Sequence, residues 1–228
     1  MKLVLFDIDG TLLWSDGAGR RSMNAALREA IGTAGPGDYS YDGKTDPQIA
    51  RDIMTHAGCP SDEIDARIPP LLARYVSLLA EDLRERRLQL FAGVAALLDA
   101  VDAAGDLTLG LLTGNVRAGA ELKLRAAGLD FARFRVGAFG SDHVERPELP
   151  AIAQRRARES LGLEIRGADV VVIGDTPADI ACGRGIGARA IAVATGHYPS
   201  AELARHAPAA VFATLEDTPA LLKVIRHV

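Results

Sequence analysis

The sequence has little of what marks secreted and membrane-spanning proteins. It contains two cysteines, Cys59 and Cys182, which lie far apart and lack the spacing of a metal site. We therefore expect free thiols in a reducing compartment and no disulfide framework. No apolar run approaches the roughly 18 residues of a transmembrane helix, and we identify no signal peptide ahead of the first strand-like segment. These absences favour a cytoplasmic protein with no membrane partner.

An excess of positive charge is also missing. The formal net charge of −4 and the pI near 5.7 leave no broad basic surface, which argues against nucleic acid as a partner. A small anionic ligand, held by a few local cations, is compatible with this balance. The 228 residues are 48% hydrophobic and 25% charged, enough to bury a substantial core. The sequence leaves open whether the protein is a monomer or a homodimer.

Short apolar runs alternate with longer amphipathic stretches along most of the chain. The runs are nearly continuously apolar, as expected for parallel strands covered on both faces. This alternation predicts an α/β fold with a doubly wound, Rossmann-like parallel sheet. The predicted strands are Leu3–Phe6, Leu107–Leu112, Val136–Phe139, Val170–Ile173, Ala188–Ala194 and Ala209–Ala213, and the predicted helices between them are Val94–Ala104, Arg117–Ala127, Ala151–Leu161 and Pro177–Gly183.

One interval interrupts this alternation. Residues 16–87 contain no convincing buried strand, and we expect them to form an α-helical cap inserted after the first strand. Residues 1–15 and 88–228 would then form the α/β core. The predicted cap helices are Arg20–Ile31, Pro47–Ala57 and Glu63–Arg86, and we expect Pro69 and Pro70 to kink or split the last of them.

Polar side chains follow several of the predicted strands. Because ligands bind at the carboxyl ends of strands in an open parallel sheet, these residues are the first candidates for a site. Asp7 and Asp9 point to the same side of an extended chain, and Asp175 follows a neighbouring strand. Carboxylates gathered this closely repel one another unless a cation lies among them, and Mg²⁺ is the natural candidate. The candidates are Asp7, Asp9, Thr113, Gly114, Asn115, Arg146, Asp175 and Asp179.

This inventory fits a phosphate as well as a metal. The Thr113 hydroxyl, backbone N–H groups near Gly10 and Gly114, and the Arg146 guanidinium are all suitable donors to phosphate oxygens. An ionised aspartate beside the metal is able to attack phosphorus as a covalent nucleophile. A second aspartate is able to protonate the leaving oxygen and later deprotonate water. The sequence thus points to phosphoryl chemistry.

At these residues the chain resembles the haloacid dehalogenase superfamily, in particular its phosphatases. The first motif of that family matches Asp7-Ile8-Asp9-Gly10-Thr11, the second matches Leu112-Thr113-Gly114-Asn115, and the fourth matches Gly174–Asp179. The resemblance implies that Asp7 is the nucleophile and Asp9 the acid/base. It also implies that Asp7, Asp175 and the Asp9 backbone carbonyl bind Mg²⁺, that Asp179 supports the metal site, and that Thr113, Gly114 and Asn115 bind the phosphoryl group.

The third motif departs from the family pattern. The family usually has a lysine there, often followed by proline, whereas this chain has Arg146-Pro147. Arginine keeps the charge but differs from lysine in reach and hydration. We expect Arg146 to bind the phosphate, with Lys123 and Lys44 as the alternative cations.

The polar loop Gly43–Pro47 opens the second predicted cap helix, and in related capped phosphatases the corresponding loop closes over the site. Lys44 or Thr45 would then meet the non-phosphate end of the substrate. The alternative is an ordinary helix start with Asp46 as N-cap and Pro47 at the first position.

The resemblance implies a Mg²⁺-dependent phosphomonoester hydrolase, similar to phosphoglycolate phosphatase, that acts on a small phosphorylated metabolite through an aspartyl-phosphate. A sugar phosphomutase similar to β-phosphoglucomutase is the main alternative, since it uses the same pair of acids. A phosphonate hydrolase would need a cap lysine such as Lys44 for a Schiff base, and a haloacid dehalogenase would need neither Asp9 nor a metal. A non-catalytic binding module that retains the fold is a further alternative.

Overall fold

The computed structural model describes residues 1–84 and 86–228, and the strands of its main sheet are all parallel. The order is β5-β4-β1-β6-β7-β8, which places the N-terminal strand in the middle. This confirms the predicted doubly wound α/β fold. The strands are β1 (Lys2–Phe6), β4 (Leu107–Thr113), β5 (Val136–Phe139), β6 (Val170–Gly174), β7 (Arg189–Val193) and β8 (Ala210–Phe212).

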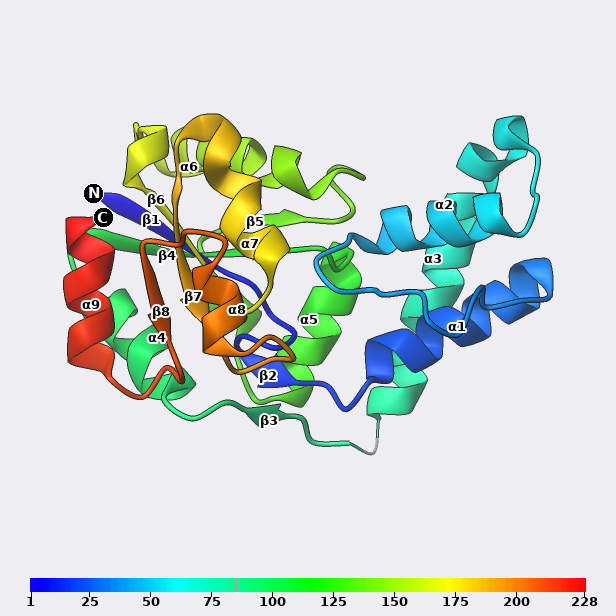
Figure 1. Cartoon of the computed structure of the whole chain (residues 1–228), viewed down its shortest axis with the longest axis horizontal. Helices are drawn as coiled ribbons and strands as arrows, with labels where there is room; N and C mark the ends of the chain where they lie inside the picture. The colour runs from blue at the N-terminus through cyan, green and yellow to red at the C-terminus, as the bar shows by residue number, and fades with distance from the viewer. Residues whose placement is uncertain (85) are drawn as a thin grey trace.

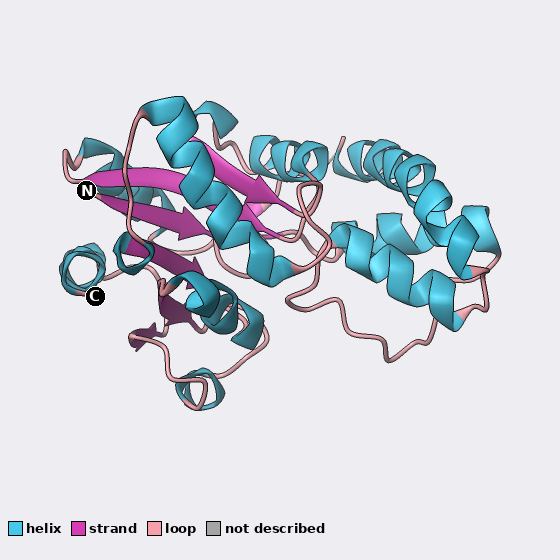
Figure 2. Cartoon of the chain, turned by 90° about the horizontal axis from the view of Figure 1, so that it is seen from above, coloured by secondary structure: helices cyan, strands magenta, loops and turns pink. Residues whose placement is uncertain are grey.

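Side chains alternate between the two faces of the sheet, and both faces are covered by helices (Figure 2). Leu3 and Leu5 of β1 belong to a cluster with Ile152 of α6, whereas Val4 and Phe6 belong to the larger cluster. Burial on both faces explains why the strands read as continuous apolar runs. The helices of this unit are α4 (Val94–Ala103), α5 (Arg117–Ala126), α6 (Leu149–Leu161), α7 (Pro177–Cys182), α8 (Ser200–Ala204) and α9 (Thr218–His227), with 3₁₀ turns η1 (Phe131–Arg133), η2 (Arg146–Glu148), η3 (Gly167–Asp169) and η4 (Gly183–Ile186).

The helices between β2 (Leu13–Trp14) and β3 (Gln89–Leu90) form a separate group beside the main sheet, on the side where its strands end (Figure 1). Helix α3 packs against both α1 and α2, and also reaches α5 of the core. Ile49, Ile53, Leu71, Tyr75 and Leu79 are buried among these helices. The helices are α1 (Ala18–Ile31), α2 (Asp46–His56) and α3 (Ser61–Leu83). All three lie inside the predicted cap, whose boundaries at 16 and 87 remain a prediction.

Helix α3 continues through Pro69 and Pro70, so the predicted split is wrong. Both prolines are exposed, as are Asp65 and Ala66, four residues earlier. The carbonyls that lose their helical partners therefore lie on a face that water reaches. Ile68 and Leu71 on either side are buried, and their packing holds the helix together. The predicted continuation of this helix to Arg86 includes residue 85, which lies outside the described residues.

A short antiparallel pair joins the two groups of helices and strands. Strands β2 (Leu13–Trp14) and β3 (Gln89–Leu90) pair where the chain leaves β1 and where it returns toward α4. The pair brings Trp14 next to the carboxyl edge of the main sheet. Neither strand was predicted, because two residues carry no periodicity.

Within residues 1–84 and 86–228, no helix combines the length and apolar character needed to cross a membrane. Cys59 and Cys182 are both free, as predicted.

Candidate active site

Strand β1 delivers Asp7 and Asp9 to the carboxyl edge of the sheet. The backbone N–H of Asp7 donates to the Ile173 carbonyl at 2.9 Å, which extends the pairing of β1 with β6 by one residue. Gly10 then turns the chain with a φ of 81°. A Cβ at Gly10 would overlap the Asp175 carboxylate, so glycine is required both for the turn and for the approach of Asp175.

Three buried carboxylates, those of Asp7, Asp175 and Asp179, form a cluster at this edge. One oxygen from each lies within 4.8 Å of the others. Burial, followed by repulsion from Asp179 and Asp7, raises the pKa of Asp175 to about 8. Burial also raises the pKa of Asp7 to about 6, against the opposing effect of Arg146. Ionised carboxylates this close together repel one another, and a hard divalent cation with oxygen ligands would relieve that repulsion.

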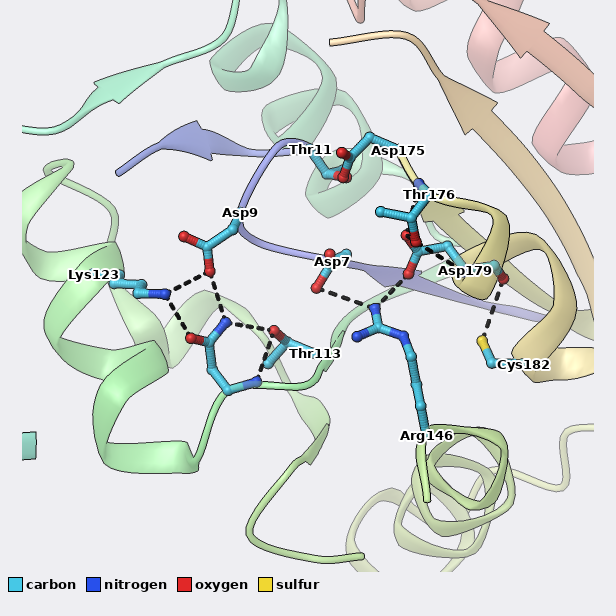
Figure 3. Close-up of polar contacts among 11 residues, drawn as sticks. Asp7, Asp9, Thr11, Thr113, Lys123, Arg146, Asp175, Thr176, Asp179 and Cys182 are labelled. Atoms are coloured by element: carbon cyan, nitrogen blue, oxygen red, sulfur yellow. Dashed lines mark hydrogen bonds and ion pairs between the residues drawn. The ribbon is translucent and has the colours of Figure 1, made fainter. Parts of the chain in front are cut away.

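Asp9, predicted as a metal ligand through its backbone carbonyl, turns its side chain away from this cluster. Its Oδ2 accepts hydrogen bonds from Lys123 Nζ at 2.6 Å and Asn115 Nδ2 at 2.8 Å (Figure 3). Burial alone would raise the pKa of Asp9, but the Lys123 ammonium and these hydrogen bonds hold it below its ordinary value. Asp7 and Asp9, which are separated by a single residue, thus have different surroundings, a pattern typical of acid/base pairs.

Arg146 lies between Asp7 and Asp179 (Figure 3). Its Nη2 is 3.3 Å from Asp7 Oδ1 and also donates to Asp179 Oδ1. The side chain is 5% exposed, and its two aspartate partners raise its pKa further above the ordinary range of arginine. Arg146 Nε is buried and has no hydrogen-bond partner among residues 1–84 and 86–228. The geometry therefore places Arg146, and not Lys123, beside the predicted nucleophile.

The start of α7 fixes Asp179. Thr176 is the N-cap, and its hydroxyl accepts a hydrogen bond from the Asp179 backbone, while Asp179 Oδ2 accepts from the Thr176 backbone at 3.0 Å. This capping box leaves Asp179 Oδ1 for Arg146. Asp179 thus anchors the arginine at the carboxylate cluster, and its predicted support of a metal site stays a prediction.

The loop after β4 carries Thr113, Gly114 and Asn115. Thr113 Oγ1 accepts from the Asn115 backbone at 3.3 Å and from Asn115 Nδ2 at 2.8 Å. The Asn115 amide is therefore occupied by Thr113 and Asp9, and its Oδ1 by Lys123. Asn115 thus holds Asp9 and Thr113 in place, and its predicted contact with a phosphate stays a prediction.

Gly114 is also a point of contact between the core and the cap. Its carbonyl accepts a hydrogen bond from the Asp46 backbone at 2.8 Å. A Cβ at Gly114 would overlap the Lys44 carbonyl, and one at Gly43 would overlap Ala178. The cap thus meets the core along a seam of close contacts, Gly43–Asp46 against Gly114 and Ala178.

Lys44 and Thr45, both predicted to meet the substrate, lie in different surroundings in the cap loop. Lys44 lines the cavity at the site, although its ammonium pairs with Asp52 and Tyr39, each at 2.9 Å. Thr45 is fully buried and is the N-cap of α2, accepting from the Gln48 backbone at 3.2 Å. The expectation that Asp46 caps this helix is wrong. Its carboxylate accepts instead from the Val116 backbone of the core at 2.8 Å.

A cavity of about 230 Å³ lies between cap and core, and Asp7 and Asp175 of the cluster line it. The cap and the linking strands contribute one side of it, and the strand ends contribute the other. Its outer wall includes Trp14, Arg20, Tyr41, Lys44, Tyr75 and His197. The ring of Trp14 meets that of His197 edge to face at 5.6 Å. Asp7, Asp9 and Asp175 thus line a pocket between cap and core.

Sequence reasoning named Lys123 only as a substitute for Arg146 and missed Tyr75 altogether. A usable indication existed for Lys123. The buried residues of α5 are Gly119, Ala120, Lys123 and Leu124, so a lysine occupies the apolar stripe of an amphipathic helix. Tyr75 lies in the buried stripe of α3 among other hydrophobic residues, so nothing in its position distinguishes it from a core residue.

Comparison with protein-family models matches residues 1–187 to the haloacid dehalogenase-like hydrolases. The chain belongs to this family. No curated protein sequence matches the hydrolase.

Solved structures of similar fold span nearly the whole hydrolase. A predicted phosphoglycolate phosphatase from Haemophilus somnus 129pt is 23% identical with a TM-score of 0.70, covering 97% of this chain and 98% of that one. CbbY from Rhodobacter sphaeroides, solved with phosphate, is 21% identical with a TM-score of 0.65, covering 95% and 96%. A putative β-phosphoglucomutase from Bacteroides vulgatus is 18% identical with a TM-score of 0.67, covering 100% and 89%. At these identities the likeness supports the fold.

Proposed function

We propose that the hydrolase is a Mg²⁺-dependent phosphatase that cleaves a small phosphorylated metabolite through an aspartyl-phosphate on Asp7. One observation carries the proposal. Asp7 is buried at the end of the central strand, with the Arg146 guanidinium 3.3 Å from its carboxylate and an oxygen of Asp175 and of Asp179 each within 4.8 Å. A nucleophilic acid, a fixed cation and a cation-binding cluster are thus combined at one point.

Asp7, Asp175 and the Asp9 backbone carbonyl would hold the Mg²⁺ ion, with Asp179 behind them. When bound, the ion neutralises the carboxylates and the charge of the phosphoryl oxygens. The raised pKa values of Asp7 and Asp175 support this assignment, because both groups gain from a nearby cation.

The donors around Asp7 are suited to the three phosphoryl oxygens. Arg146 Nε is a buried donor left without a partner in the described chain, next to the nucleophile. The Thr113 hydroxyl accepts two hydrogen bonds and keeps its own hydrogen to donate. The Gly114 backbone completes the set. Such preorganised donors stabilise the charge that develops in phosphoryl transfer.

The two acids then divide the reaction. An Asp7 carboxylate oxygen forms a bond to phosphorus while the bond from phosphorus to the leaving oxygen breaks, and Asp9, protonated in the substrate complex, gives that oxygen its proton. In the second half, Asp9 takes a proton from water as the water oxygen attacks phosphorus and releases Asp7. The cap limits the entry of water to this cycle.

The volume and lining of the cavity indicate the size of the substrate and help to compare the alternative activities. A volume of about 230 Å³ suits a small metabolite, and we propose Lys44 as a contact for its far end. The Lys44 ammonium is paired with Asp52, which opposes the neutral amine that Schiff-base phosphonate hydrolysis needs. For Thr45 the geometry favours a structural role. A sugar phosphomutase stays the second candidate, since the same acids serve it.

The test is phosphate release from p-nitrophenyl phosphate and from two- to six-carbon phosphometabolites, including phosphoglycolate and hexose phosphates, with Mg²⁺ and with EDTA. We expect turnover that requires the metal and falls by at least about 10³-fold in Asp7→Asn. A phosphomutase would instead isomerise a hexose phosphate and release little phosphate. Turnover that survives EDTA, or that Asp7→Asn leaves unchanged, contradicts the proposal.

A further inference from the structure

Lys123 is a buried lysine whose ammonium is committed to the site. The side chain is 4% exposed, and Nζ lies 2.6 Å from both Asp9 Oδ2 and Asn115 Oδ1 (Figure 3). Burying a lysine is costly unless its charge is paired and its hydrogens are bonded. Because burial of the Lys123 ammonium carries this free-energy cost, we look for its role in the site.

The three side chains form a closed triangle. Lys123 donates to Asp9 and to Asn115, and Asn115 Nδ2 donates to Asp9 Oδ2 at 2.8 Å. Both donors thus meet the same oxygen of Asp9. The other oxygen, Asp9 Oδ1, is buried and accepts no hydrogen bond within the described chain. The triangle therefore fixes the orientation of the Asp9 carboxyl group.

The cap closes the far side of Lys123. A Cβ at Gly19 of α1 would lie 3.0 Å from Lys123 Nζ, and the Lys123 charge reaches the buried Asp46 of α2. The lysine is thus enclosed between helix α5 and the cap, with little room to move. The cation that pairs with Asp7 is Arg146, so Lys123 does not serve as the third-motif cation.

We propose that Lys123 is a positioning residue for Asp9, an inference that rests on the proposed phosphatase function. By holding Oδ2 together with Asn115, it fixes the orientation of the carboxyl group that exchanges the proton. That carboxyl group, protonated in the substrate complex, gives its proton to the leaving oxygen as the phosphorus–oxygen bond breaks, and accepts one from water in the second half. Without Lys123 the carboxyl group rotates, and proton delivery fails while the attack by Asp7 continues.

This role predicts a dependence on the leaving group. A phenolate leaves poorly without a proton, whereas 2,4-dinitrophenolate leaves without one. The comparison is kcat/KM for phenyl phosphate and for 2,4-dinitrophenyl phosphate with Mg²⁺, because kcat/KM reports phosphoryl transfer to Asp7. In Lys123→Met we expect a loss of about 10²-fold on phenyl phosphate, the size of general acid catalysis, and of less than about threefold on dinitrophenyl phosphate.

Asp9→Asn provides the reference for that pattern, and the double variant should lose no more than Asp9→Asn alone, since the two residues act as a unit. Lys123→Arg keeps the charge but moves the donors, so a smaller loss with the same preference is expected even if Lys123→Met folds poorly. Lys223→Met, on the exposed face of α9, controls for the loss of a lysine.

Equal losses on both substrates in Lys123→Met and Lys123→Arg, or no loss in either, would overturn the positioning role. Failure of the proposed function looks different. In that case the wild-type hydrolase shows no Mg²⁺-dependent turnover of either substrate, and the inference falls with it.

Discussion

At the scale of single residues, the site depends on glycines as much as on acids. Gly196, in the loop after β7, leaves so little space that an added Cβ would overlap Asp175 Oδ2. We expect Gly196→Ala to displace that carboxylate and to weaken Mg²⁺-dependent turnover by about 10- to 100-fold. A Mg²⁺ titration of phosphatase activity measures the effect.

Gly185→Ala is the matched control, because an added Cβ there meets nothing within 4 Å. It should titrate with Mg²⁺ like the wild type. A wild-type titration curve for Gly196→Ala would show that Asp175 does not hold the metal where we place it.

The sequence was sufficient for residues whose role follows from their place after a strand. Asp7, Asp175 and Asp179 all reach one cluster because parallel strands end at one edge. It was insufficient where a role depends on the partner that tertiary packing supplies. Asn115 was expected at the phosphate, but Lys123 and Asp9 occupy its side chain. The periodicity of β4 does not report which side chain of the following helix, α5, will lie beside the end of the strand.

At the scale of elements, the start of α2 shows how a helix cap also secures an interface. The Thr45 hydroxyl accepts from the Gln48 backbone and donates to the Val144 carbonyl at 2.6 Å. Thr45→Ala removes both, which should cost about 1–3 kcal/mol of unfolding free energy. Urea denaturation measures it.

Thr45→Ser keeps the hydroxyl and should recover most of that stability. Thr55→Ala, exposed on the same helix, should change it by less than about 0.5 kcal/mol. If Thr45 binds substrate instead, Thr45→Ala would raise KM with little effect on unfolding.

Elements were predictable where burial is uniform. All the strands of the main sheet were identified within a residue or two, because burial on both faces makes them continuously apolar. Helices α8 and α9 were not predicted, since a five-residue helix and an amphipathic terminal helix beside mixed sequence give weaker patterns. Local rules also failed at Pro69 and Pro70, where packing of neighbouring residues outweighs the loss of two hydrogen bonds.

At the scale of the whole molecule, Asp46 links cap to core and makes the stability of the fold depend on pH. Burial raises its pKa to about 6, so between about pH 4 and 6 the folded protein binds more protons at this residue than the unfolded chain. The contribution of Asp46 to stability therefore falls as pH rises through that window. A shift of about two units corresponds to at most about 3 kcal/mol.

Asp46→Asn keeps an oxygen for the Val116 N–H and does not titrate. Relative to the wild type, it should gain unfolding free energy between pH 4 and pH 7, measured by urea denaturation in EDTA. Asp62→Asn, exposed on α3, controls for the loss of one negative charge. A difference between Asp46→Asn and wild type that stays flat or shrinks with rising pH would contradict the assignment.

The seam between cap and core has a consequence for how such an enzyme changes over evolution. Gly114 lets main chain meet main chain there, and Gly43 leaves room for the Cβ of Ala178, so these contacts do not depend on the side chains of Arg20, Tyr41 and Lys44. Substitutions at positions such as Arg20, Tyr41 and Lys44 are then free to alter which metabolite fits, while the contact between cap and core persists. We therefore expect substrate preference to change during evolution without a change in the way the cap docks on the core.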